Sequence, residues 1–134
     1  MPSTGPLLHD RAQLRVVNGS RGVVLAERAT VAARPWSRMR GLLGRPPLAP
    51  GEGLLIVPCQ GVHTVGMGYP IDVVHLDRRG LVRRVLRGLS PWRIGPLVWR
   101  GHLVLELPAG GAATDVGEQL AFEPLESRPG LSSL

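Results

Sequence analysis

Short hydrophobic runs alternate with polar turns along this chain, and two of these turns predict β-hairpins. The stretch LRVVNGSRGVVLAERA, residues 14–29, places two valine-rich runs around Asn18-Gly19, a pair suited to the positive φ angles of a tight turn. The turn DRRG, residues 77–80, separates PIDVVHLD from LVRRVLRGL in the same way. In PIDVVHLD, His75 and Asp72 fall on opposite faces of the strand. Each pair of runs therefore predicts two antiparallel strands.

Three further segments complete the predicted sheet. GLLIVPC, residues 53–59, is a continuous apolar run ended by proline, which is typical of a strand buried on both faces. HLVLELPAG, residues 102–110, predicts a strand with its three leucines turned inward. GAATDVGEQLAFE, residues 111–123, predicts one helical turn followed by a closing strand.

The clearest helix signal lies in TVAARPWSRMRGLLGR, residues 30–45. Pro35 suits the first turn of a short helix, and Gly41 and Gly44 suit its end. The large apolar residues of this segment are expected to share one buried side of the helix: Trp36, Met39, Leu42 and Leu43.

These elements predict a mainly β (α+β) protein with about seven short strands and one or two short helices. Glycine (18) and proline (13) are frequent, which favours short elements joined by turns over long helices. A compact mixed sheet or a barrel-like fold is the natural way to cover so many strand edges. We expect a loose leader over residues 1–11, a single domain over residues 12–124 and a flexible tail over residues 125–134.

The net charge of +6 raises the question of nucleic-acid binding. All of the basic residues are arginine, and those of residues 78–87 form a stripe on a predicted strand pair that could follow a phosphate backbone. The stripe lacks the interleaved aromatic residues of a single-strand binder. A solvated charged face is therefore favoured, and arginine-mediated nucleic-acid binding is kept as an alternative.

The chain has a single cysteine, so its fold does not depend on an internal disulfide. Its sequence shows neither an apolar run typical of a signal peptide nor one long enough to span a bilayer. We expect a soluble cytoplasmic protein without a membrane segment.

Candidate chemistry concentrates in CQGVHTVGMGYPIDVVHLD, residues 59–77. Cys59, His63 and Met67 have the spacing of a copper ligand loop, but the only histidine upstream is His9, in the leader. Structural zinc sites need closely paired ligands, and this chain has one cysteine. The sequence therefore predicts neither a metal site nor another cofactor.

Cys59 and His63 also raise the hypothesis of a nucleophilic pair oriented by Asp72, in a hydrolase- or transferase-like enzyme. The simpler interpretation is that Cys59 is a small buried side chain at the end of a strand. A reactive thiol needs an electropositive setting, and the sequence shows no motif for an oxyanion hole. An enzyme is therefore the less favoured interpretation.

A second interpretation joins two loops through an ion pair between Asp72 and Arg93. The loops together supply a cluster of candidate ligand-binding residues: His63, Thr64, Asp72, Trp92 and Arg93. Such a cluster either holds the loops together or forms a polar cleft for a small polar ligand or a segment of a partner protein. Glu106 interrupts LVLELPAG and is expected either on an exposed face or paired with an arginine such as Arg84.

Five segments in order resemble the DUF192 family of small prokaryotic proteins of unassigned function: RMRGLLGR, GLLIVPC, VHTVGMGYPIDVVHLDRRGLV, PWR and LVLELPAG…VGEQL. The resemblance covers roughly residues 14–122. It implies a compact, mainly β domain with a short helix at RGLLGR, and it implies no reaction. Its signature positions here are His63, Thr64, Met67, Asp72, Asp77, Trp92, Arg93, Glu106 and Gly110. The sequence thus favours a non-catalytic binding or accessory module.

Overall fold

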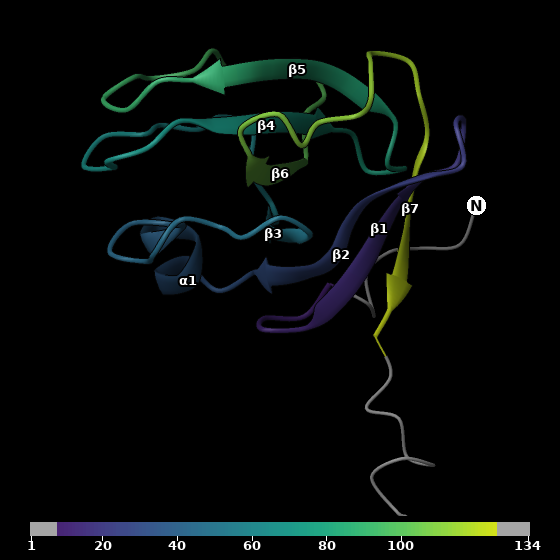
Figure 1. Ribbon diagram of the computed structural model, residues 1–134, viewed down its shortest axis with the longest axis horizontal. Coiled ribbons are helices and arrows are strands. Elements are labelled where there is room, and N and C mark those ends of the chain that lie inside the picture. Colours follow the sequence, from purple (N-terminus) through teal and green to yellow (C-terminus); the bar gives the residue numbers. More distant parts are fainter. Residues whose placement is uncertain (1–7, 126–134) are drawn as a thin grey trace, which may run out of the picture.

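A computed structural model describes residues 8–125 of the chain, which form seven β-strands and one short helix (Figure 1). In chain order these are β1 Gln13–Asn18, β2 Val23–Ala32, α1 Pro35–Arg40, β3 Glu52–Ile56, β4 Ile71–Leu76, β5 Val82–Leu89, β6 Leu103–Pro108 and β7 Leu120–Pro124. The mainly β prediction is confirmed. No helix within residues 8–125 is long and apolar enough to cross a membrane.

All seven strands belong to one sheet in the order β5-β4-β6-β3-β2-β1-β7. Neighbouring strands are antiparallel, except that β2 and β3 run parallel. A parallel pair cannot be joined by a tight hairpin, so the chain between β2 and β3 crosses over through α1. Figure 1 shows α1 at the left of the molecule, away from the converging ends of β1 and β7.

The sheet curls into a half-barrel whose two edge strands meet at one corner. Leu81, just before β5, forms a bridge with Gln119, just before β7. Two backbone hydrogen bonds support this closure, from Val82 N to Glu118 O at 2.9 Å and from Leu120 N to Gly80 O at 2.9 Å. Curling the sheet in this way covers edges that would otherwise be open to pairing with another chain.

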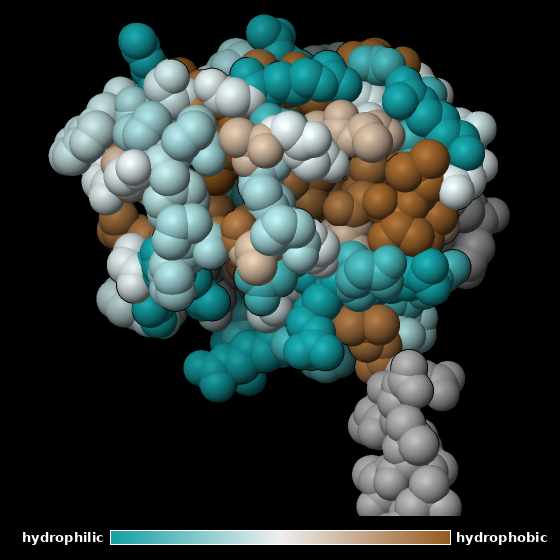
Figure 2. Space-filling model, viewed as in Figure 1, coloured by the Kyte–Doolittle hydropathy of each residue, from teal (hydrophilic) through white to brown (hydrophobic). Residues whose placement is uncertain are grey.

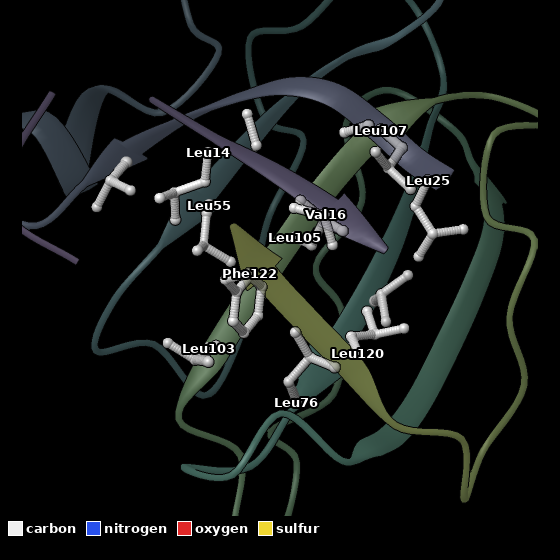
Figure 3. Close-up of a cluster of buried hydrophobic side chains, with 14 of the residues drawn as sticks. Leu14, Val16, Leu25, Leu55, Leu76, Leu103, Leu105, Leu107, Leu120 and Phe122 are labelled. Carbon is white, nitrogen blue, oxygen red and sulfur yellow. The ribbon is translucent and has the colours of Figure 1, made fainter. Parts of the chain in front are cut away.

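The sheet buries hydrophobic side chains on both faces. Figure 3 shows the first cluster, in which leucines of β1, β3, β6 and β7 point toward one another around Phe122 inside the half-barrel. The second cluster lies on the other face, where Ile56, Val73 and Val104 pack under Leu42 and Met67. Strand β3 contributes to both clusters, which confirms the prediction of a strand buried on both faces.

Hydrophobic side chains also reach the surface beside the first cluster. Figure 2 shows them gathered where β2, β1 and β7 converge, with hydrophilic side chains around them. The exposed Val23, at the start of β2, belongs to the same strand as the buried Leu25. The half-barrel is therefore less completely covered near the start of β2 than at its centre.

Both predicted hairpins form, but the first has a longer turn than expected. The turn between β1 and β2 spans Asn18 to Gly22, and its residue with positive φ is Gly22 (φ 69°) rather than the Asn18-Gly19 pair. The buried Asn18 shapes the turn through its side chain, whose Oδ1 accepts hydrogen bonds from the amides of Ser20 (3.0 Å) and Arg21 (3.2 Å). The second turn ends at Gly80 (φ 82°) as predicted.

The predicted buried side of α1 is wrong. The helix begins at Pro35 and ends before Gly41, as expected, but no residue within it is buried. Trp36 and Met39 are exposed, and Leu42, just after the helix, is the residue that packs into the second cluster.

The leader expected over residues 1–11 and the tail expected over residues 125–134 fall mostly outside the described residues. Within residues 8–11, Leu8 packs into the first cluster and the Arg11 amide donates to Val31 O at 2.8 Å. The domain limits stay predictions.

Candidate functional site

Two loops, residues 57–70 and 90–102, run side by side over the second hydrophobic cluster. The Thr64 amide donates to Arg93 O (2.8 Å), the Trp92 amide donates to Thr64 O (2.9 Å), and the Gly95 amide donates to Val62 O (2.8 Å). Figure 1 shows both loops and α1 on the left of the sheet. These segments form a layer, here called the outer layer, that contains several of the predicted site residues.

Thr64 fixes the two loops to each other. Its side chain is fully buried, and its Oγ1 donates to Ser90 O (2.6 Å) and accepts a hydrogen bond from the Arg93 amide (2.9 Å). Because this hydroxyl already donates one hydrogen bond and accepts another within the protein, it has little remaining capacity to bind a ligand. Thr64 is therefore part of the support of the site rather than its lining.

Asp72 is also buried, and its side chain also forms hydrogen bonds with the backbone of other segments. Its carboxylate accepts hydrogen bonds from the amides of Gly88 (2.8 Å), Gly110 (3.0 Å) and Ala112 (3.0 Å). The predicted ion pair with Arg93 is wrong, because Asp72 points to the opposite face of β4 from Ile71 and Val73, which pack under the outer layer. Asp72 ties the ends of β5 and β6 to β4.

Cys59 and His63 line an open groove of about 740 Å³ between the loops. Its walls are mostly apolar and include Val62, Val65, Ile94 and Leu97. Trp92 and Arg93 are exposed beside this groove and do not line it. The structure thus brings together Cys59 and His63, and leaves the other predicted site residues outside the groove.

The surroundings of Cys59 disfavour its thiolate. Burial is the main cause that raises its pKa, and the thiol donates a hydrogen bond to Gly61 O at 2.8 Å. His63 is exposed, and its Nδ1 accepts a hydrogen bond from the Val65 amide at 3.3 Å. Since Asp72 lies on the other face of β4, it does not orient His63.

A narrow cavity of about 80 Å³ lies under α1 and shares Arg38, Cys59 and His63 with the groove. Glu106, on β6, lines this cavity and is only 3% exposed. Burial raises the pKa of Glu106 to about 7, and no side chain or amide within residues 8–125 donates a hydrogen bond to offset it. A buried carboxyl group without a partner is costly to a fold, so its position calls for an explanation.

The predicted partner of Glu106 is also corrected by the structure. In the sheet Glu106 pairs in register with Leu54 of β3 and Val73 of β4, both buried and apolar, whereas Arg84 lies opposite His75. Glu106 is therefore neither exposed nor paired with Arg84. It shares its face of β6 with Val104, which belongs to the second cluster.

Two other polar groups near this cavity lack partners. The buried Tyr69 hydroxyl and the buried Arg38 Nε make no hydrogen bond within the described chain. Burial raises the pKa of Tyr69, and the charge of Glu106 adds a smaller effect on both Tyr69 and Cys59. The cavity thus places Glu106 and the unpartnered Arg38 Nε beneath an apolar groove, and Tyr69 lies outside the cavity lining.

Sequence reasoning did not place Glu106 at this cavity. The sequence contained a signal for its burial. Glu106 is the single charged residue of an otherwise apolar strand, and it lies two positions from Val104, on the same face of the strand. Among residues 8–125, no three histidine, cysteine, aspartate or glutamate side chains are grouped as metal ligands.

Comparisons with known proteins agree with this fold. Residues 16–122 match DUF192, a family described as "Uncharacterized ACR". A "putative transcription regulator" from Sinorhizobium meliloti 1021 is similar in structure, with a TM-score of 0.71, 24% identity, and coverage of 85% of this chain and 96% of that one. A protein of unknown function from Novosphingobium aromaticivorans DSM 12444 has a TM-score of 0.68 and 22% identity, with 81% and 83% covered.

At these identities the two structures show the fold alone. No curated protein matches the sequence. The match to DUF192, in contrast, spans most of the chain and both loops of the outer layer. The chain therefore belongs to the DUF192 family.

Proposed function

We propose that this protein is a binding module whose groove takes a small molecule with an apolar body and a short hydrogen-bonding tip. The apolar body would lie between Val62 and Leu97, and the tip would enter the cavity and reach Glu106. The observation that carries the proposal is a buried carboxyl group without a partner at a cavity beneath an apolar groove.

The sizes of the two hollows support such a ligand. A volume of about 740 Å³ is in the range of small-molecule sites, whereas about 80 Å³ has room for roughly two or three water-sized groups. A terminal ammonium or hydroxyl group fits the smaller space. Either would supply the hydrogen bond that Glu106 lacks, and an ammonium would also favour its ionised form.

Two observations favour binding over the nucleophile alternative. The raised pKa of Cys59 keeps its sulfur protonated, while the thiolate is the reactive form. The Asp72 carboxylate, which was expected to orient His63, instead accepts hydrogen bonds from three backbone amides. The lining of the groove offers apolar area and hydrogen-bonding positions, which are the features of a binding site.

The test uses three linear probes that differ only at the tip: hexylamine, hexanol and hexanoate. We expect hexylamine to bind most tightly and hexanoate most weakly, with amide chemical shifts moving at Gly61, Val62 and Val65. In Glu106→Gln the preference for the amine over the alcohol should fall by about tenfold or more, which corresponds to about 1.4 kcal/mol.

Glu123→Gln is the matched control, because Glu123 is exposed on β7 and lies away from the groove. It should leave all three affinities unchanged. The proposal is wrong if none of the probes shifts the groove amides, or if hexanoate binds as well as hexylamine.

A further inference from the structure

The outer layer exposes large hydrophobic side chains, and of the most exposed ones the proposed groove uses only Ile94 and Leu97. Six of them are between 68% and 82% exposed: Trp36, Met39, Trp92, Ile94, Leu97 and Trp99. They include all three tryptophans of the chain. They lie on α1 and on the loop of residues 90–102, and both segments line the groove, through Arg38 of α1 and through Ile94 and Leu97 of the loop. Large apolar side chains that stay exposed on adjoining segments mark a place where a protein meets a partner or a membrane.

The loop that carries four of these side chains is held in a fixed conformation. The Trp92 and Gly95 amides bond to loop 57–70, and the Val98 amide donates to Gln60 O at 2.9 Å. Val98 itself is buried, while its neighbours Leu97 and Trp99 point into solvent. The backbone therefore presents these side chains outward in a defined arrangement, and their exposure does not result from a loop without contacts.

The charge of the outer layer has one sign. The two loops, and residues 34–45 that contain α1 and its flanks, include no aspartate or glutamate, and all ten acidic residues of the chain lie elsewhere. The same three segments contain six arginines: Arg34, Arg38, Arg40, Arg45, Arg93 and Arg100. Two acids border these segments, Asp10 beside the start of α1 and Asp77 in an adjoining hollow, and both are outnumbered by the arginines. A surface that combines exposed tryptophans with an excess of arginines is complementary to an apolar layer bounded by negative charge.

A basic hollow adjoins this surface. It measures about 720 Å³, and its lining includes Arg78, Arg79, Arg100 and His102 with a single acid, Asp77. Arg100 follows Trp99 directly, so an arginine of the hollow and an exposed indole sit next to each other in the chain. Guanidinium groups bind phosphate oxygens through paired hydrogen bonds.

We propose that the outer layer docks on the surface of an anionic lipid bilayer. Trp92, Trp99 and Trp36 would lie at the level of the headgroups, where amphipathic indole rings are favoured. Ile94 and Leu97 would enter the acyl boundary, and the arginines would bind the anionic headgroups.

A bilayer suits this surface better than a nucleic acid does. Ile94, Leu97 and Met39 are aliphatic or thioether side chains that a phosphate backbone leaves in water, whereas a bilayer buries them. The stripe of residues 78–87, the earlier nucleic-acid candidate, contributes Arg78 and Arg79 to the hollow beside the outer layer.

Tryptophan fluorescence tests the proposal directly, since all three tryptophans lie on the outer layer. The probes are vesicles of phosphatidylcholine alone and vesicles that also contain about 30% phosphatidylglycerol, at about 0.15 M salt. We expect a blue shift and co-sedimentation with the anionic vesicles, and at least about tenfold weaker binding to the neutral ones.

Two double variants separate the contributions: Trp92→Ser with Trp99→Ser, and Arg93→Glu with Arg100→Glu. Each should lower vesicle binding by about tenfold or more, while circular dichroism stays unchanged because these side chains are exposed. The control Val116→Ser removes an exposed apolar residue outside the outer layer and should bind vesicles as the native chain does.

The proposal is overturned if the protein stays in the supernatant with anionic vesicles, or if the control variant weakens binding as much as the double variants do. It is also overturned if a single-stranded oligonucleotide shifts the fluorescence and vesicles do not. A blue shift that follows protein concentration without vesicles would indicate a second copy of the chain and would also overturn it. Glu106→Gln should retain vesicle binding, so failure here and failure of the proposed groove are distinguishable.

Discussion

At the scale of single residues, the buried polar side chains divide into those whose hydrogen bonds are complete and those that lack partners. Asp72 and Asn18 are surrounded by donors and acceptors of the chain. Glu106 and His75 are buried without partners in the described residues, and both His75 ring nitrogens are unbonded. The first kind stabilises loops, whereas the second lowers the stability of the folded state.

Replacing Asp72 by alanine should destabilise the fold strongly. Three backbone amides would lose a charged acceptor inside the protein, and hydrogen bonds to charged groups contribute about 1.5–3 kcal/mol each. We expect a loss of about 3 kcal/mol or more in urea unfolding. Asp77→Ala is the control: Asp77 is partly exposed and accepts from the Arg79 and Leu81 amides, so its loss should cost about 1 kcal/mol. Equal losses would contradict this assignment.

The raised pKa of Glu106 predicts that the folded state loses stability as the pH rises toward and through 7. Its folded pKa of about 7 lies above the ordinary value of 4.5, so the folded state keeps a proton that the unfolded state releases between these values. In Glu106→Gln this titration is absent. Urea unfolding should therefore show the variant gaining about 2–3 kcal/mol over the native chain between about pH 5 and pH 8.

The titration of His75 changes stability with pH in the opposite direction, so its effect has to be separated from that of Glu106. Burial, and then the charge of Arg84, lower the pKa of His75 to about 4, so its contribution to stability is lost as pH falls from 6.5 toward 4. Both the native chain and Glu106→Gln contain His75, so their difference isolates Glu106. A difference that stays constant with pH would contradict a titrating Glu106.

At the scale of elements, Thr64 carries the contact between the two loops of the outer layer. Thr64→Val keeps the shape of the side chain but removes the hydrogen bonds to Ser90 O and from the Arg93 amide. We expect a loss of about 1–3 kcal/mol and faster hydrogen exchange at the Arg93 and Trp92 amides.

Thr30→Val is the matched control for Thr64→Val. Thr30 is a partly buried threonine of β2 that lies outside the two loops. Its replacement should leave exchange at Trp92 and Arg93 unchanged. If both variants speed exchange equally, Thr64 does not hold the loops.

The elements that the sequence predicted are those whose signals are local. The two hairpins depend on alternation and turn residues within about twenty positions, and both formed. The parallel pairing of β2 with β3 and the position of β6 between β4 and β3 depend on contacts between distant segments, which no local pattern encodes. The predicted buried side of α1 failed because spacing alone does not say which side of a one-turn helix meets the sheet.

Contacts between distant segments also explain why the candidate site was predicted only in part. Loops 57–70 and 90–102 were expected to meet, and Thr64 and Arg93 do meet, through backbone and hydroxyl rather than through charge. Asp72 was expected to face these loops, but its three amide donors come from segments that only the folded sheet brings near it. Glu106 was expected to be exposed or paired with Arg84, and this was wrong because its burial results from its neighbours Leu54 and Val73, which are distant in sequence.

At the scale of the whole molecule, one buried side chain links the turn after β1 to the segment that closes the half-barrel. Asn18 Nδ2 donates to Glu118 Oε1 (2.9 Å) and to Ala113 O (3.2 Å). Arg21 adds an exposed ion pair to Glu118 at 2.8 Å. The segment that Asn18 holds includes the acceptor of the Val82 amide, so Asn18 supports the corner where β5 and β7 meet.

Asn18→Ala should therefore open this corner before the rest of the sheet. We expect the Val82 and Leu120 amides, which bond across the corner, to exchange about tenfold faster or more, because local opening requires less free energy than global unfolding. The Leu105 amide, in the interior strand β6, should show a smaller change. Ser20→Ala is the control in the same turn, since Ser20 is exposed and accepts a single hydrogen bond from the Gln119 amide. If the Leu105 amide accelerates as much as Val82 and Leu120 do, the corner opens only with global unfolding and the half-barrel behaves as one cooperative unit.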